Sequence, residues 1–212
     1  MIQGLIFDLD GVLVTTEENH YLAWKRIADA LKIPFDEHEN ENLKGVSRAD
    51  SLRYLLRLGN LEVDAHEFEA LLEEKNSYYL DSIAHISRDQ MLPGALNLLL
   101  EARNNGLLLA VGSSSKNAKF ILQKLGIKDW FRTIVDGHGV STPKPHPEVF
   151  LNAAAGLGLP VSACLVFEDA QSGVEAAKAG GFRAIGVGNP AIQPLCDDFY
   201  SSLELFSISK YE

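Results

Sequence analysis

The stretch GLIFDLDGV at residues 4–12 decides the fold of this chain. Residues 4–7 form a short apolar run, which is typical of a strand buried on both faces of a parallel sheet. Asp8 and Asp10 follow at once, so two carboxylates leave this strand at its carboxyl end, where open α/β sheets bind their ligands. A lone Asp-Gly pair after a strand more often makes a plain turn, so the rest of the chain must decide between the two interpretations.

Strand and helix patterns alternate over the second half of the chain. Further short apolar runs predict strands at residues 107–111, 133–136, 164–167 and 184–187. The patterns between them predict helices at residues 94–104, 116–125, 147–157 and 171–179. This alternation predicts an α/β fold with a Rossmann-like, doubly wound parallel sheet. The last stretch, residues 189–212, has weak periodicity and is assigned to a loop with one further helix.

A long segment, residues 15–83, separates the first strand from this alternation. It carries helical patterns and no convincing strand, so we expect a small helical domain inserted into a core made of residues 1–14 and 84–212. Its 69 residues hold 15 Asp and Glu against 8 Lys and Arg, which accounts for −7 of the net charge of −10. Most of this acidic excess is expected on a solvated face.

Composition limits the classes of partner. With 46% hydrophobic and 23% charged residues in 212, the chain is expected to pack as a globular protein. A net charge of −10 opposes binding to nucleic acid or to an anionic membrane surface. No stretch approaches the roughly 18 apolar residues of a membrane span, and the N-terminus has no basic leader. The two cysteines suit a reducing compartment, so we expect a mature cytoplasmic protein.

Three more polar groups follow predicted strands. Ser113 opens the run SSS before a helix, where hydroxyl and backbone N–H groups bind phosphate, although plain helix capping explains it equally well. Lys144 lies between two prolines that restrict the backbone around it, yet alone it would be a surface lysine. Glu168 and Asp169 are adjacent carboxylates that would repel each other without a nearby cation, so they indicate a Mg²⁺ site. The four sites together are hard to explain as structure alone.

In this order, DLDGV, Ser113, Lys144 and the pair Glu168–Asp169 resemble the four motifs of the haloacid dehalogenase superfamily of phosphotransferases. The inserted helical segment resembles the small cap of that superfamily. Within it, the segments FDLDGVL (7–13), HYLAW (20–24), LKGVSRADSL (43–52), SSSKN (113–117) and EDAQSG (168–173) resemble the β-phosphoglucomutase family, with departures at Thr15 and Ser114.

The resemblance implies a role for each core residue. Asp8 would be the nucleophile that carries the phosphoryl group, and Asp10 the general acid and base. Ser113 and Lys144 would hold the transferring phosphate, and the Mg²⁺ ligands would be Asp8, Asp10, Glu168 and Asp169. A carboxylate can approach an anionic phosphoryl group only if cations neutralise its oxygens, so the chemistry requires these residue types.

The resemblance also implies a substrate-binding set outside the four motifs. Thr16, His20 and Trp24 recur every four residues and share one helix face, although Trp24 is equally well explained as a core residue. The other members would contact the sugar and its second phosphate, and they are Lys44, Gly45, Arg48, Ser51, Lys116 and Asn117. Arg48 can grip a phosphate through two donors at once, which a lysine cannot do.

The activity that the resemblance implies is interconversion of β-D-glucose 1-phosphate and glucose 6-phosphate through β-glucose 1,6-bisphosphate. The substrate would be a small phosphosugar, and we expect a monomer. Two alternatives stay open at this point. A sugar-phosphate phosphatase with a cap shares the core motifs, and a signalling receiver would be phosphorylated on Asp8 without turning over a metabolite.

Overall fold

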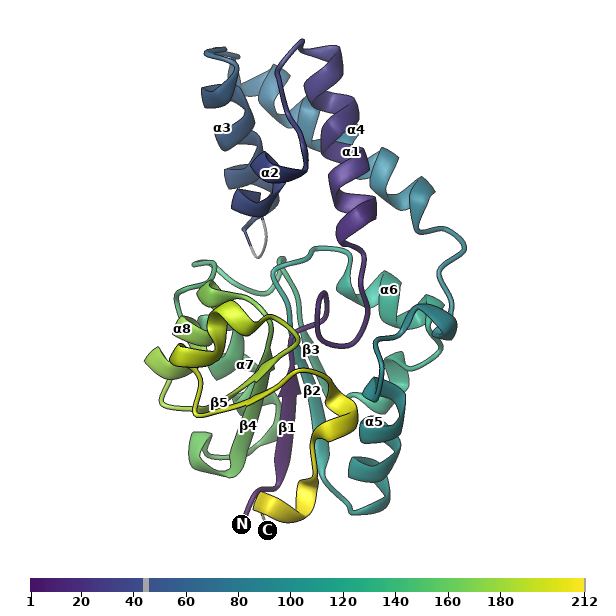
Figure 1. Ribbon diagram of the computed structural model, residues 1–212, viewed down its shortest axis with the longest axis vertical. Coiled ribbons are helices and arrows are strands. Elements are labelled where there is room, and N and C mark those ends of the chain that lie inside the picture. The colour runs from purple at the N-terminus through teal and green to yellow at the C-terminus, as the bar shows by residue number, and fades with distance from the viewer. Residues whose placement is uncertain (44–45, 212) are drawn as a thin grey trace. The chain divides into compact units, whose positions relative to one another are not determined.

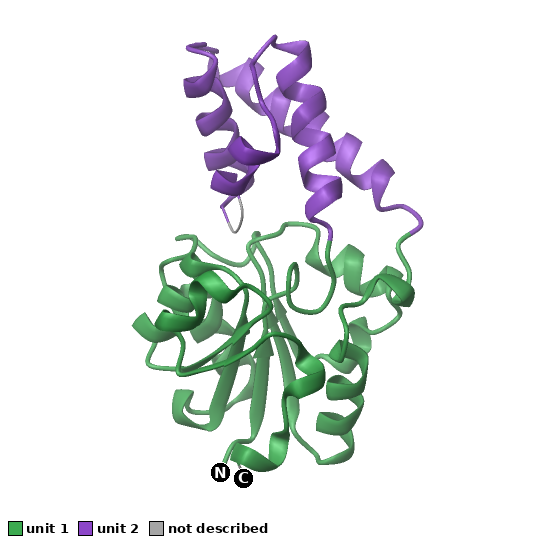
Figure 2. Ribbon diagram, viewed as in Figure 1, with its two compact units in different colours: residues 1–15, 86–212 green, residues 16–85 purple. Residues whose placement is uncertain are grey.

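The computed structural model describes residues 1–43 and 46–211 (Figure 1). The chain forms two compact units: residues 1–15 with 86–212, and residues 16–85 (Figure 2). We call the first the sheet unit and the second the helical unit.

The sheet unit is built on six strands in the order β3-β2-β1-β4-β5-β6, and every neighbouring pair is parallel. The strands are β1 (Gly4–Phe7), β2 (Leu108–Gly112), β3 (Thr133–Val135), β4 (Cys164–Glu168), β5 (Arg183–Val187) and β6 (Asp198–Tyr200). The predicted α/β fold class is confirmed. The chain order reverses beside β1, and sheets of this kind place their sites at such a switch point.

Helices cover both faces of this sheet (Figure 1). They are α5 (Ala95–Asn104), α6 (Ala118–Lys124), α7 (Glu148–Leu157) and α8 (Gln171–Ala179). On one face of the sheet, α7 and α8 pack their apolar residues against Ile6, Ala110 and Val166. Successive side chains of a strand alternate between the two faces of the sheet, and these three lie on the same face. The strands are therefore buried on both sides, which is why they read as continuous apolar runs.

The register brings the polar residues that follow the strands to one edge. Phe7 pairs with Val111 on one side and with Phe167 on the other. Asp8 and Glu168 consequently leave the sheet side by side. The backbone N–H of Asp8 still donates to the Phe167 carbonyl at 2.9 Å, so the nucleophile candidate is held by the sheet itself.

The helical unit contains α1 (Glu17–Ala30), α2 (Glu37–Asn40), α3 (Arg48–Leu58) and α4 (Ala65–Ser82). Asp36, Ser47 and Asp64 cap the starts of α2, α3 and α4, because each side chain accepts a hydrogen bond from the backbone of the first turn. Apolar residues of α1, α3 and α4 form a separate core that includes Trp24 and Leu52. In the described part of the chain, no helix is both long and apolar enough to cross a membrane.

The C-terminal segment differs from the prediction of a loop and one further helix. It contains β6 and three 3-10 helices, at Pro190–Leu195, Leu203–Leu205 and Ile208–Tyr211. The strand has only three half-buried residues, too few to show an alternating pattern. Tertiary contacts hold it instead. Asp198 pairs with Arg183 of β5 at 2.7 Å, and the Phe206 ring packs edge-on against Phe167 at 4.9 Å.

Candidate active site

The carboxylate of Asp8 faces the ammonium of Lys144 at the carboxyl end of β1. Lys144 Nζ lies 2.5 Å from Asp8 Oδ1 and 2.5 Å from Glu168 Oε1, and its side chain is only 3% exposed. Burial disfavours the charge of Lys144, but the two carboxylates outweigh burial and raise the pKa of the ammonium. The sequence alone would allow Lys144 to be a surface residue. In the structure it is a buried cation between two acids.

Glu168 is fixed from several directions. Its Oε1 accepts from Lys144, and its Oε2 accepts from the backbone N–H groups of Asp169 and Ala170, both at 3.1 Å. Gly173 of α8 makes room for it, since a Cβ added there would lie 1.8 Å from Glu168 Oε1. Burial raises the pKa of Glu168, while the charge of Lys144 lowers it. The glycine and the lysine together explain how this acid is buried at 1% exposure.

Asp169 lies against the turn that carries Asp10. A Cβ added to Gly11 would be 2.0 Å from Asp169 Oδ2, and Gly11 has φ of +85°, so this position requires glycine on both counts. Burial, together with the negative charges of Glu168, Asp8 and Asp10, raises the pKa of Asp169 to about 9. Four acids thus share one small region of the sheet unit.

These acids fit a divalent cation by their chemistry. Oxygen ligands are those that Mg²⁺ prefers. The raised pKa of Asp169 reflects burial first and then repulsion from the neighbouring acids, and a cation would relieve that repulsion. As the side chains stand, no three acidic, histidine or cysteine groups in the described residues converge tightly enough to hold a metal ion. Lys144 lies between Asp8 and Glu168 in this arrangement. The site therefore has the oxygen ligands that the ion requires, and the Lys144 ammonium lies among these acids.

The predicted phosphate-binding loop follows β2. Ser113 is 2% exposed; its backbone N–H donates to the Val135 carbonyl, and its Oγ accepts from the Ser115 N–H at 3.1 Å. Asn117 is the cap residue of α6, without a side-chain cap bond, and Lys116 is exposed. The Ser113 hydroxyl thus forms a turn in the loop after β2, whereas the cap position of α6 belongs to Asn117.

In the helical unit, the predicted face of α1 packs against α4. Thr16 Oγ1 lies 2.9 Å from the hydroxyl of Tyr79, and His20 Nδ1 lies 2.7 Å from Lys75 Nζ. Burial lowers the pKa of His20 well below 6.5, and the positive charges of Lys75 and Arg48 lower it further. Because an ammonium can only donate, Nδ1 accepts and the imidazole is neutral.

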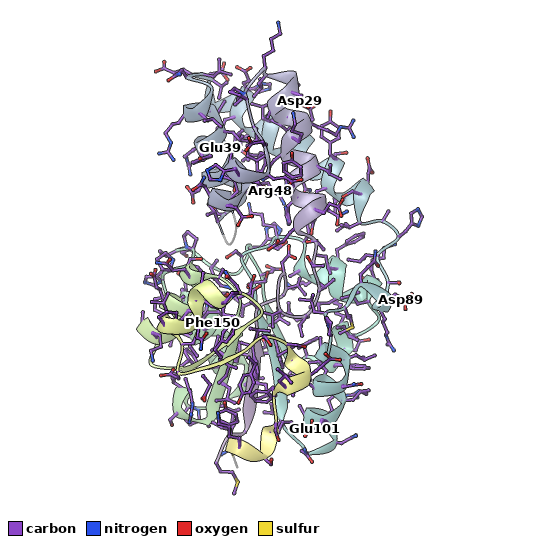
Figure 3. The ribbon with its side chains drawn as sticks, in the orientation of Figure 1. Asp29, Glu39, Arg48, Asp89, Glu101 and Phe150 are labelled. Carbon is purple, nitrogen blue, oxygen red and sulfur yellow. The ribbon has the colours of Figure 1, made fainter. Side chains whose placement is uncertain are left out.

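The other predicted residues of this unit differ in their surroundings. Trp24 is 3% exposed within the helical core, as the core interpretation predicts. Ser51 is buried, and its hydroxyl donates to the Ser47 carbonyl at 3.0 Å. Arg48 is the first residue of α3 (Figure 3), and partial burial lowers the pKa of its guanidinium. Lys44 and Gly45 lie outside the described residues.

The helical pattern of the sequence includes Lys75 and Tyr79, but sequence reasoning assigns neither of them to the site. Lys75 is 2% exposed, and its ammonium lies 4.9 Å from the Trp24 ring and 4.8 Å from the Tyr79 ring. Lys75 and Tyr79 occupy the apolar stripe of α4. A lysine at a core-facing position of such a stripe is the signal that could have identified this cluster.

The comparisons with known proteins identify the family of this chain. The model of the haloacid dehalogenase-like hydrolases matches residues 2–181. The chain belongs to this family of enzymes. It is 42% identical over 189 residues to a β-phosphoglucomutase of Bacillus subtilis, covering 88% of this chain and 84% of the relative. It is 30% identical over 186 residues to a fructose-1-phosphate phosphatase of Escherichia coli, covering 87% and 95%.

A solved structure gives the same picture for the fold. The crystal structure of a β-phosphoglucomutase from Clostridium difficile superposes with a TM-score of 0.95 at 37% identity, covering all of this chain and 96% of the other. The family model ends at residue 181, before β5 and β6. The superposition nevertheless includes the C-terminal segment, so that segment is a regular part of this architecture.

Proposed function

We propose that this protein is a β-phosphoglucomutase, which interconverts β-D-glucose 1-phosphate and glucose 6-phosphate through β-glucose 1,6-bisphosphate. The observation that carries the proposal is the buried Lys144 ammonium, 2.5 Å from both Asp8 and Glu168. A carboxylate can attack a phosphoryl group only where positive charge offsets the repulsion between them. A lysine fixed beside the nucleophile supplies that charge.

In the proposed reaction, an oxygen of Asp8 forms a bond to phosphorus as the bond from phosphorus to the sugar oxygen breaks. Asp10 protonates the leaving oxygen, and in the reverse direction it removes the proton from the attacking hydroxyl. Lys144 and Ser113 hold the transferring group at the end of the sheet. In the complete cycle, phosphorylated Asp8 donates its phosphoryl group to the 6-hydroxyl of β-glucose 1-phosphate, which forms the bisphosphate. Asp8 then takes the phosphoryl group from the 1-oxygen of the bisphosphate, which releases glucose 6-phosphate and restores the aspartyl phosphate.

We assign the Mg²⁺ ligands to Asp8, Asp10 and Asp169, with Glu168 beside them. Both oxygens of Glu168 already accept hydrogen bonds from Lys144 and the backbone, which favours a positioning role for it within the predicted set. When bound, the ion would neutralise part of the charge on the phosphoryl oxygens. The chain's own contribution is to hold these carboxylates together despite their repulsion.

The helical unit supports a mutase over a phosphatase. A mutase must bind a second phosphate that does not react, and Arg48 and Lys75 place basic groups near His20 in an otherwise acidic segment. Arg48 is the residue we assign to the second phosphate. The relative at 42% identity is named a β-phosphoglucomutase, which agrees with this assignment.

The second candidate is a phosphosugar phosphatase, in which water attacks the aspartyl phosphate. The relative named fructose-1-phosphate phosphatase, at 30% identity, favours it. Purified protein should be assayed with β-glucose 1-phosphate, with and without glucose 1,6-bisphosphate, following glucose 6-phosphate and free phosphate separately. Glucose 6-phosphate that depends on the bisphosphate supports the mutase, whereas free phosphate as the main product contradicts it. EDTA should stop either reaction until Mg²⁺ is restored.

A further inference from the structure

Helix α7 begins with an acid that closes the loop carrying Lys144. Glu148 is the first residue of α7, and both of its carboxylate oxygens accept backbone hydrogen bonds. Oε1 accepts from the Ser141 N–H at 2.7 Å, and Oε2 accepts from the Thr142 N–H at 2.9 Å. The side chain thereby ties residues 141–142 to the start of the helix, with Lys144 in the middle of the closed segment.

Other contacts of α7 act on the same loop. Asn152, one turn further along the same helix face, donates to the Gly139 carbonyl at 3.3 Å. Phe150, labelled in Figure 3, is fully buried, and its ring centre lies 4.7 Å from Lys144 Nζ. Helix α7 thus holds the start of the loop through Asn152 and packs the Phe150 ring against the Lys144 ammonium.

The bonds of Glu148 are those of an ionised carboxylate. The two backbone donors, that of Ser141 first, lower the pKa of Glu148, so the acid keeps its charge at neutral pH. A carboxylate that accepts two backbone N–H groups makes charge-assisted hydrogen bonds, which are stronger than neutral ones. Its side chain is 23% exposed, and these contacts serve neither the hydrophobic core nor another helix.

We propose that Glu148 is a positioning residue for phosphoryl transfer, which acts by holding the loop so that the Lys144 ammonium reaches Asp8 and Glu168. The buried side chain of Lys144 extends from this loop to Asp8 and Glu168, at the ends of β1 and β4. A loop released at residues 141–142 would let the ammonium move away from the nucleophile. The inference rests on the proposed function, because it gives Lys144 a phosphoryl group to act on.

The first measurement does not depend on any substrate. Glu148→Ala and Glu148→Gln are treated with acetic anhydride at low dose, and acetylation of each lysine is followed by mass spectrometry. Lys144 should be labelled about tenfold faster in Glu148→Ala than in the parent protein, with the exposed Lys119 and Lys178 as internal references. Glu148→Gln keeps the size of the side chain but loses one of the two acceptor oxygens, so it should show a smaller increase.

The second measurement is phosphorylation of Asp8 by acetyl phosphate with Mg²⁺. We expect kcat/KM to fall about tenfold in Glu148→Ala, with Tm within a few degrees of the parent value. Glu101→Ala, which removes an exposed glutamate from α5, is the matched control and should change neither readout. If Glu148→Ala does not fold, Glu148→Gln carries both measurements.

Unchanged labelling of Lys144 overturns the proposal, and so does faster labelling with normal phosphorylation of Asp8. Faster labelling of all buried lysines together with a large fall in Tm also overturns it, because that result means general unfolding. A parent protein that is phosphorylated on Asp8 but does not interconvert the sugar phosphates would refute the mutase and leave this test intact. A parent protein that is not phosphorylated at all would refute the proposed chemistry, while the labelling still tests the loop contact.

Discussion

The two units of this protein gather charges of opposite sign. In the sheet unit, four acids crowd around one lysine, and burial with mutual repulsion raises the pKa of Asp169 to about 9. In the helical unit, burial lowers the pKa of His20, and the positive charges of Lys75 and Arg48 also lower it, although the surrounding segment is strongly acidic. Each unit therefore holds like charges close together, acids in the sheet unit and bases in the helical unit.

The difference suggests a division of labour. An acid cluster with a lysine suits a metal ion and a phosphoryl group in transfer, so the bond changes belong to the sheet unit. A cluster of bases suits an anion that is held without reacting, so in the proposed function the helical unit recognises the second phosphate. Removal of the reacting groups of the first unit should abolish all activity, whereas removal of the bases of the second should act selectively.

The largest effect is expected for Asp8→Asn. An amide cannot form the acyl phosphate, and it also removes one negative group from the acid cluster, so turnover should fall below detection for every substrate. The measurement is trapping of labelled phosphate on the protein after brief mixing with acetyl phosphate. Labelled protein at the parent level would show that Asp8 is not the nucleophile.

A smaller but still large effect is expected for Gly173→Ala, which tests how the sheet unit fixes its acids. The new Cβ would lie 1.8 Å from Glu168 Oε1, so Glu168 must move and Lys144 with it. A displacement of about 1 Å at a reacting centre can cost about 10²-fold in rate, and we expect a loss of that order in kcat.

The neighbouring Ser172→Ala is the control for that substitution. The Ser172 hydroxyl is buried without a hydrogen-bond partner among the described residues, so its removal should leave kcat unchanged. Because alanine is favoured over glycine inside a helix, Gly173→Ala need not lower Tm. Equal kcat for the two variants would mean that the exact place of Glu168 does not matter.

The sheet unit was largely predictable from sequence for a physical reason. Asp8 and Ser113 follow β1 and β2 directly, and Glu168 is the last residue of β4. Parallel strands bring such positions to one edge whatever the conformation of the loops. The residues that position these side chains cannot be predicted from the sequence. Glu148 holds a loop seven residues before it, and Gly173 only matters once α8 lies beside β4, so neither leaves a local pattern.

The helical unit was predictable as helices but not as a site. The apolar stripe of α4 indicates an amphipathic helix, yet the same pattern does not say that Lys75 lies beside His20 of α1. Helix pairing decides that contact. The strand β6 likewise depends on contacts that no local pattern predicts, namely its pairing with β5 and the ion pair between Asp198 and Arg183.

Arg48→Ala tests the division of labour directly. If Arg48 holds the second phosphate, its removal should cost roughly 1.5–3 kcal/mol of charge-assisted binding, or about ten- to a hundredfold in kcat/KM for the sugar phosphates. Phosphorylation of Asp8 by acetyl phosphate, which has no second phosphate, should continue at close to the parent rate. Arg53→Ala, further along α3, is the control. Equal losses in both assays would contradict a selective role for the helical unit.

The smallest effect concerns the pH dependence of stability in the helical unit. Burial first, and then the charges of Lys75 and Arg48, lower the pKa of His20, so the native state keeps a neutral imidazole. The unfolded chain takes up a proton as the pH falls below about 6.5, which makes the free energy of unfolding decrease toward acid pH by at most about 1.4 kcal/mol per pH unit. Lys75→Met removes one cause, so the pKa of His20 should rise and this slope should weaken.

The slope is measured by urea unfolding between pH 7.5 and 5.5, and the titration of His20 by NMR. His20→Gln should flatten the dependence, while His66→Gln, which removes an exposed histidine of α4, should leave it as in the parent protein. An unchanged slope in His20→Gln would mean that this histidine does not titrate on unfolding. In that case the bases of the helical unit would not lie close enough to His20 to affect its pKa. The contrast between the two units would then not hold for the helical unit.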